Sequence, residues 1–168
     1  MIINKTGKIV DSLFMLGHSG VPVYLIDGDE PALFDAGFSC LGELYVQEIR
    51  KILETRKPKF CFLSHSHFDH CGAVSTFKKY FPNIKIVAAP IAKKNFKRPN
   101  AIALIKQLNK DSESMMQDIM ITKGQANDFC SFDVDLTVQE NDVLKIADNI
   151  SVKIIETPGH TRDCLSYY

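Results

Sequence analysis

The sequence predicts an α/β domain in which strands and helices alternate along the chain. Between residues 21 and 88, apolar runs of strand length alternate with segments whose apolar residues recur every three or four positions. Turn-forming residues separate most of these segments. Residues 136–168 then return to strand-like sequence. This order is typical of a layered domain with helices packed on a sheet.

The first predicted elements form a β-hairpin followed by a helix. Residues 21–26 have strand composition, and the turn-forming run 27–31 precedes a second short strand. The helix that follows has apolar residues at helical spacing. Ser39 is expected to cap its start, and Pro58 lies beyond its end.

A strand, a helix and another strand are predicted next. Residues 59–63 form a short apolar run typical of a buried parallel strand. Gly72 is expected to open a helix that stops before Pro82. Residues 84–88 are predicted as the strand that follows this helix.

The middle of the chain is predicted as a helical insertion, at about residues 91–135, within a single domain of residues 1–168. Asn100 can cap a helix there, whereas residues 129–135 give no clear pattern. Four further strands are expected at 136–138, 143–147, 151–156 and 165–168.

The composition favours a globular protein without a general affinity for polyanions. Hydrophobic residues make up 45% of the 168 residues, which is enough for a packed core, and the formal net charge is +0. Nucleic-acid and membrane partners are therefore not expected. Five cysteines at irregular spacing argue against a disulfide framework. With no secretory segment in the sequence, a cytoplasmic location is expected.

The strongest chemical feature is the run His65-x-His67-x-Asp69-His70, which follows the predicted buried strand at 59–63. Loops at strand ends are held at both ends and often carry functional sites. Imidazole and carboxylate together suit zinc or iron. His160, in the predicted loop after strand 151–156, could add a further ligand. The remaining histidine, His18, has no motif around it and is not expected to bind metal.

Three motifs in order resemble the metallo-β-lactamase-fold superfamily. The run from His65 to His70 is similar to its HxHxDH motif, and residues 33–37 resemble its strand-Asp-x-Gly segment. Residues 157–161 resemble its TPGHT segment. The resemblance implies an αβ/βα four-layer sandwich with metals at one edge of two facing sheets. It is weakest between residues 91 and 135.

The resemblance also implies roles for individual residues. His65, His67 and His160 would hold a first metal, and Asp69 and His70 would belong to a second. Asp69 would also orient the attacking water or move a proton. Asp35 would be a buried acid behind the ligands that stiffens the metal loop. Zinc, as one or two ions, is the expected cofactor, and iron or manganese are alternatives.

The resemblance is incomplete at the C-terminal end. The family normally supplies a bridging Asp and another His further downstream, whereas the acid after His160 is Asp163, which lies too close in the chain to match. The fold is therefore expected to be C-terminally incomplete, as in a truncated enzyme or a short relative that completes its site by association. A strand at 165–168 would leave a sheet edge, so self-association through that edge is expected.

Three functions remain open from the sequence. The first is metal-dependent hydrolysis of an ester, thioester, lactone or related bond in a small molecule, with water activated by the metal. The second is an iron-dependent redox activity, as in flavodiiron proteins or persulfide dioxygenases. The third is metal binding without catalysis. Cys71, beside His70, is expected to be a small buried hydrophobe rather than a ligand.

Overall fold

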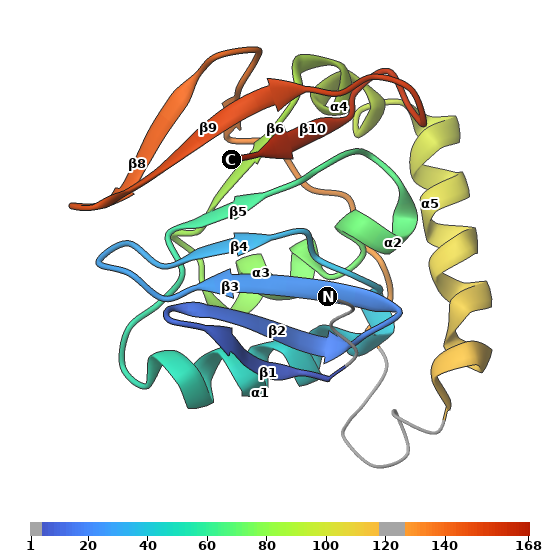
Figure 1. Cartoon of the computed structure of the whole chain (residues 1–168). Helices are drawn as coiled ribbons and strands as arrows, with labels where there is room; N and C mark the ends of the chain where they lie inside the picture. Colours follow the sequence, from blue (N-terminus) through green and yellow to red (C-terminus); the bar gives the residue numbers. More distant parts are fainter. Residues whose placement is uncertain (1–4, 118–126) are drawn as a thin grey trace.

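The computed structural model describes residues 5–117 and 127–168, which form two sheets and a set of helices (Figure 1). The larger sheet has seven strands in the order β1-β2-β3-β4-β5-β6-β7. The strands are β1 (Gly7–Val10), β2 (Leu13–His18), β3 (Val21–Ile26), β4 (Ala32–Phe34), β5 (Phe60–Phe62), β6 (Lys85–Ala88) and β7 (Leu136–Thr137). Pairing is antiparallel from β1 to β4 and parallel from β4 to β7.

The smaller sheet is antiparallel and comes from the C-terminal part of the chain. Its strands are β8 (Val143–Ala147), β9 (Ile150–Glu156) and β10 (Leu165–Tyr167), in the order β10-β9-β8. The two sheets therefore come from separate parts of the chain, and residues from both must meet wherever a site lies between them.

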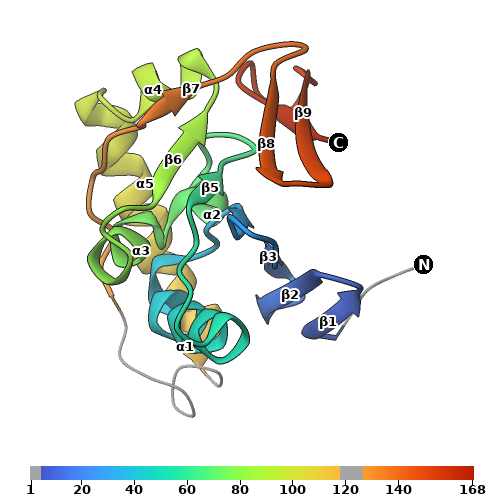
Figure 2. The ribbon, with the colours of Figure 1, turned by 90° about the vertical axis from the view of Figure 1, so that its left-hand side faces the viewer.

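Helices lie on one side of the large sheet, and the small sheet lies on the other (Figure 2). The helices are η1 (Ser39–Leu41), α1 (Gly42–Leu53), α2 (Phe68–Cys71), α3 (Val74–Tyr80), α4 (Pro90–Asn95), α5 (Pro99–Ser112) and η2 (Glu113–Met116). In the described part of the chain, no helix covers the outer face of the small sheet (Figure 2). The described residues thus form three of the four layers of the expected sandwich, which confirms the predicted fold class.

The core lies mainly between the large sheet and the helices. Along β3, Val23 and Leu25 are fully buried, whereas Tyr24 and Ile26 are half-buried and point to the opposite face. On α1, residues at helical spacing such as Tyr45 and Ile49 are fully buried against this sheet. Apolar burial therefore fixes the helix layer on the sheet.

Three local sequence predictions were wrong. The helix expected to open at Gly72 is α3, which begins at Val74, and the sequence did not predict the short helix α2, on which Asp69 and His70 lie. Ser39 does not cap α1, because Leu41 occupies the N-cap position and makes no side-chain cap bond. Asn100 does not cap α5 either, since that helix begins at Pro99.

The region predicted as an insertion holds α4, α5 and η2 up to Met116, followed by irregular backbone at 127–135. Residues 118–126 of this segment lie outside the described residues. Its status as an insertion in a single domain stays a prediction. Over residues 5–117 and 127–168, no helix combines the length and the apolar composition that a bilayer-spanning segment needs.

Candidate metal centre

The predicted ligands lie where strand ends of the two sheets meet. His65 and His67 follow β5 in the connection to α2, and Asp69 and His70 occupy the first turn of α2. His160 lies in the loop between β9 and β10 of the small sheet. The structure brings all five together, although His160 is more than ninety residues from His67 along the chain.

Three histidines form a compact group. One ring nitrogen from each of His65, His67 and His160 lies within 4.8 Å of the others. His67 Nδ1 and His160 Nε2 are 3.0 Å apart. Zinc–nitrogen bonds are about 2.0–2.1 Å long, so the ring nitrogens bound to one zinc ion must lie only a few ångströms from each other. The spacing of this group is thus suited to one divalent ion.

His65 has the environment of a neutral ligand. Its Nδ1 lies 3.0 Å from Ser64 Oγ, while its Nε2 is buried and has no hydrogen-bond partner. Buried polar atoms are rarely left unpaired in proteins, so an unpaired one calls for an explanation. Burial, followed by the charges of His70 and His67, lowers the pKa of His65 to about 4. The ring therefore keeps a free lone pair at neutral pH, which a metal ion can use.

His70 lies beside this group and between two carboxylates. Its ring centroid is 4.1 Å from that of His65, its Nδ1 is 2.8 Å from Asp35 Oδ2, and its Nε2 is 3.4 Å from Asp69 Oδ2. Burial acts to lower the pKa of His70, but the hydrogen bonds to Asp35 and Asp69 outweigh it and raise the pKa to about 10. Without a cation nearby, His70 therefore carries a proton at neutral pH.

Asp69 is ionised in this setting. Burial opposes its charge, but the hydrogen bond and the charge of His70 outweigh burial and lower the pKa of the carboxyl. The pair formed by Asp69 Oδ2 and His70 Nε2 therefore presents an oxygen and a nitrogen donor side by side, once His70 gives up its proton.

Asp35 organises the base of the site. Its carboxylate accepts hydrogen bonds from the backbone N–H and the hydroxyl of Ser64, at 2.8 and 3.0 Å, and contacts His70 as described. Its backbone is left-handed, with φ of 61°, a conformation that Asp tolerates better than most residues. This bend turns the chain after β4 under α2, where the N–H of Ala36 donates to the carbonyl of His70.

Several polar residues that the sequence did not single out also build the site. Ser66, between His65 and His67, donates its backbone N–H to Asp163 Oδ2 at 2.8 Å. Its hydroxyl accepts a hydrogen bond from Asn95 Nδ2 on α4 at 3.0 Å. These partners lie 97 and 29 residues away in the sequence, so no local pattern could have revealed them.

Asn109 of α5 supports the other side of α2. The side chain is buried, accepts a hydrogen bond from the N–H of Ser39 at 2.8 Å, and donates to the carbonyl of Phe68 at 3.2 Å. Gly72 lies against it, because a Cβ there would come within 2.5 Å of Asn109 Oδ1 and of the backbone at Gly37 and Ser39. This close packing fixes the helix that carries Asp69 and His70. Cys71 points into the core and is fully buried, and burial raises its pKa well above the ordinary value.

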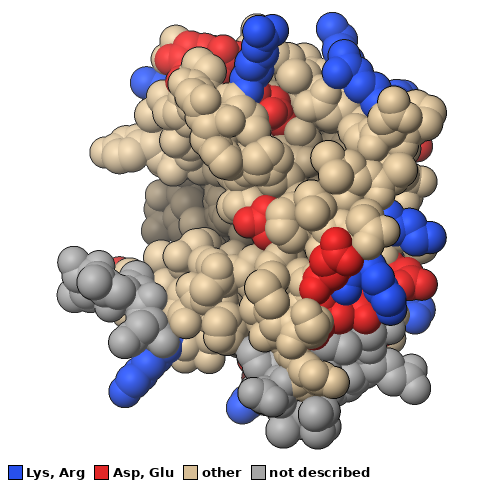
Figure 3. Space-filling view, turned by 90° about the vertical axis from the view of Figure 1, so that its right-hand side faces the viewer, with Lys and Arg blue, Asp and Glu red and all other residues tan. Residues whose placement is uncertain are grey.

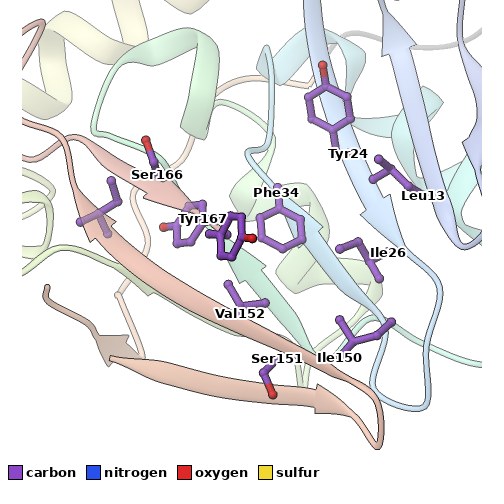
Figure 4. A pocket seen from close by; sticks show the side chains of 11 residues that line it. Leu13, Tyr24, Ile26, Phe34, Ile150, Ser151, Val152, Ser166 and Tyr167 are labelled. Atoms are coloured by element: carbon purple, nitrogen blue, oxygen red, sulfur yellow. The ribbon is translucent and has the colours of Figure 1, made fainter. Parts of the chain in front are cut away.

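An apolar cleft opens between the two sheets, beside the strand ends that carry the predicted ligands. Figure 3 shows a hollow between the upper and lower halves of the molecule, with Lys and Arg gathered toward the margins of this face. The cleft has a volume of about 590 Å³ and is lined by β3 and β4 on one side and by β9 and β10 on the other. Phe34 and Tyr167 point toward each other across it, with ring centroids 5.5 Å apart (Figure 4).

Comparison with known proteins agrees with this geometry. The family model described as the Metallo-beta-lactamase superfamily matches residues 16–168. This chain belongs to the metallo-beta-lactamase superfamily. The matched range contains all the residues of the candidate metal centre.

Solved metallo-beta-lactamases have the same fold. A subclass B3 enzyme of Bradyrhizobium japonicum aligns with a TM-score of 0.68 and 21% identity, over 95% of this chain and 54% of that chain. An enzyme from Novosphingobium pentaromativorans aligns with a TM-score of 0.69 and 19% identity, over 96% and 54%. The chain thus spans about half the length of these structures. At such identities the likeness shows the fold alone.

Two curated flavoproteins match a shorter part of the chain. A diflavin flavoprotein from Synechocystis sp. is 29% identical over 69 residues, which are 41% of this chain and 12% of that protein. A putative diflavin flavoprotein from Nostoc sp. is 30% identical over the same length.

Proposed function

We propose that this chain carries the metal site of a metal-dependent hydrolase that acts on an ester, thioester, lactone or related small-molecule bond. The observation that supports it best is the buried, unpartnered Nε2 of His65 beside ring nitrogens of two further histidines. Three histidines with a position left open for water or substrate are one of the ligand sets of catalytic zinc ions.

Zinc is the expected metal, and the donors divide into two groups. His65, His67 and His160 would hold one ion, and Asp69 with His70 would contribute to a second. When bound, such an ion lowers the pKa of a water molecule from 15.7 toward about 7 and polarises the bond to be cleaved. Iron and manganese are alternatives, because imidazole and carboxylate do not choose strongly between these metals.

The chain's own residues supply positioning and proton transfer. Asp69 is ionised, so its carboxylate can hold the attacking water and take up its proton. Asp35 holds the ring of His70 through Nδ1, which directs Nε2 toward Asp69. Ser64 ties Asp35 to the start of the HxHxDH segment, so the acid and the ligands keep a fixed relation.

Zinc-dependent hydrolysis tests the proposal. The protein, purified without a histidine tag, is loaded with zinc and assayed on an aryl ester, an acyl thioester, a lactone and a β-lactam. We expect turnover of at least one of the first three, with loss of about 100-fold or more in Asp69→Asn. If the zinc-loaded protein is no faster than Asp69→Asn on all four, the hydrolase proposal is wrong.

A second candidate function is an iron-dependent redox activity. It is supported by the partial similarity to two diflavin flavoproteins. Metal analysis of protein expressed in medium containing both metals separates the two candidates. Retention of iron rather than zinc would support the redox activity, and retention of zinc would support the hydrolase. Metal binding with no activity in either assay would leave the chain as a metal-binding unit alone.

We also propose that a second copy of the chain pairs with the edge strand β10. In the described part of the chain β10 ends its sheet, Tyr168 beyond it is 87% exposed, and the apolar cleft opens beside both. The outer edge of β10 is bonded to the large sheet at Leu165, whose N–H donates to the carbonyl of Ser64, and sheet edges that are not fully paired favour association. Light scattering over a range of concentrations tests this, and a strictly monomeric mass at high concentration would contradict it.

A further inference from the structure

Two segments that belong to different sheets are joined by a short row of hydrogen bonds, here called the seam. Tyr167 Oη donates to the carbonyl of Leu63 at 2.7 Å, and the N–H of Leu165 donates to the carbonyl of Ser64 at 2.8 Å. The third bond of the seam joins the N–H of Ser66 to Asp163 Oδ2 at 2.8 Å. The seam thus runs from the end of β5 directly into the metal-binding segment.

The third bond differs from the other two in its position. Ser66 stands between His65 and His67, and Asp163 stands three residues after His160. Every other bond of the seam ends before the first histidine of the HxHxDH motif. Within the seam, the contact between Asp163 and Ser66 is therefore the bond that reaches the ligand-bearing loops at the level of the ligands.

Asp163 is also an unusual residue to bury. It is only 4% exposed, and no Lys, Arg or His within residues 5–117 and 127–168 forms an ion pair with it. Burying a carboxylate is costly unless hydrogen bonds or an opposite charge compensate it. The hydrogen bond from the N–H of Ser66 offsets part of this cost, so the burial of Asp163 is coupled to the position of the metal-binding segment.

Ser66 is held from a second direction as well. Asn95 on α4 donates to its hydroxyl, so the main chain and the side chain of this residue have separate partners. A backbone fixed in this way has little freedom to turn, and the two rings on either side keep their directions. His67 Nδ1 stays 3.0 Å from His160 Nε2 in this arrangement.

We propose that Asp163 is a positioning residue that holds the His65–His67 segment opposite His160 and thereby sets the affinity and geometry of the three-histidine site. This inference rests on the proposed metal site. Asp163 would act through Ser66 and would not bind the metal itself. Buried groups behind metal ligands typically change metal affinity by about 10- to 100-fold when they are removed.

Metal affinity and cobalt spectroscopy test this role. Zinc dissociation constants are measured by competition with a chromophoric chelator, and the visible spectrum of the Co²⁺ form reports ligand geometry. Asp163→Ala should weaken zinc binding by about 10- to 100-fold and change the Co²⁺ spectrum. Asp163→Asn should recover most of both, because its amide oxygen can accept the same N–H.

Asp135→Ala is the matched control. Asp135 also accepts a backbone N–H, from Ile86 at 2.8 Å, and it is paired with Lys78 rather than with any residue of the candidate site. Its loss should lower the free energy of unfolding of the metal-free protein and leave zinc affinity and the Co²⁺ spectrum unchanged. If Asp163→Ala does not fold, Asp163→Glu displaces the acceptor by one methylene and should still alter the spectrum.

The outcomes separate the two proposals. Wild-type protein that binds neither Zn²⁺ nor Co²⁺ would overturn the proposed metal site, and the role of Asp163 with it. Wild-type binding that is unchanged in Asp163→Ala and Asp163→Glu would overturn the role of Asp163 alone. An equal loss of affinity in Asp163→Ala and Asp135→Ala would also overturn it, since general destabilisation would then explain both.

Discussion

The two faces of the large sheet differ in how completely they are covered. On the helix side, Leu25 and Leu33 are fully buried. On the opposite side, their neighbours Ile26 and Phe34 line the open cleft between the sheets. The strand ends that carry the candidate metal centre are nevertheless joined by several hydrogen bonds that involve residues from both sheets. The arrangement of the ligands therefore depends on hydrogen bonds at strand ends more than on apolar packing between the sheets.

The largest expected effect concerns the ligands themselves. His67→Ala should weaken binding of the first metal by more than about 100-fold, the upper end of the range for residues behind a metal site. His70→Ala should leave that metal largely in place, because His70 belongs to the second donor pair. His18→Ala is the control. Metal content after dialysis is the measurement, and equal losses from the first two variants would contradict the assignment.

Neighbouring residues on β3 test the difference between the two faces of the sheet. Leu25→Ala should lower the free energy of unfolding by about 2–5 kcal/mol, the usual range for a fully buried side chain. Ile26→Ala should cost less, because this side chain lines an open cleft that solvent already enters. Neither should change zinc affinity in the folded protein. Urea unfolding gives both values, and equal costs would mean that the cleft is filled in solution.

Packing behind α2 is expected to be nearly as sensitive. Gly72→Ala would place a Cβ within 2.5 Å of three atoms, two of which belong to the backbone. We expect a loss of about 1–3 kcal/mol in the free energy of unfolding. Gly159→Ala, where nothing lies within 4 Å of the added Cβ, should change stability by less than about 0.5 kcal/mol. Similar values for the two variants would contradict the described packing.

The smallest expected effect is a pH dependence of the metal-free protein. The pKa of His65 falls from 6.5 to about 4 on folding, so the unfolded state binds more protons below pH 6.5 and stability decreases as the pH falls. From pH 6.5 to 5.5 the loss should be about 1 kcal/mol. The pKa of His70 rises to about 10, so its contribution is fully present below pH 6.5 and decreases as the pH rises toward 10.

Urea unfolding with a chelator present, at pH 5.5, 6.5 and 8.0, measures both effects. The wild-type protein should be most stable near pH 6.5. His65→Asn should remove the decrease on the acid side, and His70→Asn should remove the decrease on the alkaline side. A stability that is unchanged in all three proteins across this range would contradict the described environments of the two rings.

The fold class could be predicted from the sequence because its evidence is local. Strand-length apolar runs, turn residues and the three motifs each occupy a few consecutive positions. Helix starts were predicted less well: Ser39 lies in η1, where its N–H bonds Asn109, and the short helix α2 is held by a bond from the N–H of Ala36 to the carbonyl of His70. Those are tertiary contacts, which a local pattern does not contain.

The candidate site also has one part that the sequence predicts and one part that only the structure shows. The cluster from His65 to His70 is visible as a motif, whereas the contacts of Asp163, Asn95 and Asn109 join residues that are distant in the chain. Asp163 was noticed in the sequence only as an acid too close to His160 to bridge two metals. Its contact with Ser66 depends on how the two sheets meet, and this could be learned only from the structure.

Metal content tests the central claim most directly. Elemental mass spectrometry is performed on protein purified without a histidine tag or added metal, with His67→Ala prepared in parallel. We expect about one equivalent of zinc or iron per chain in the wild type, or up to two if the second donor pair is completed, and close to none in His67→Ala. A wild-type chain without metal that also takes up none from zinc or iron solutions would contradict the account.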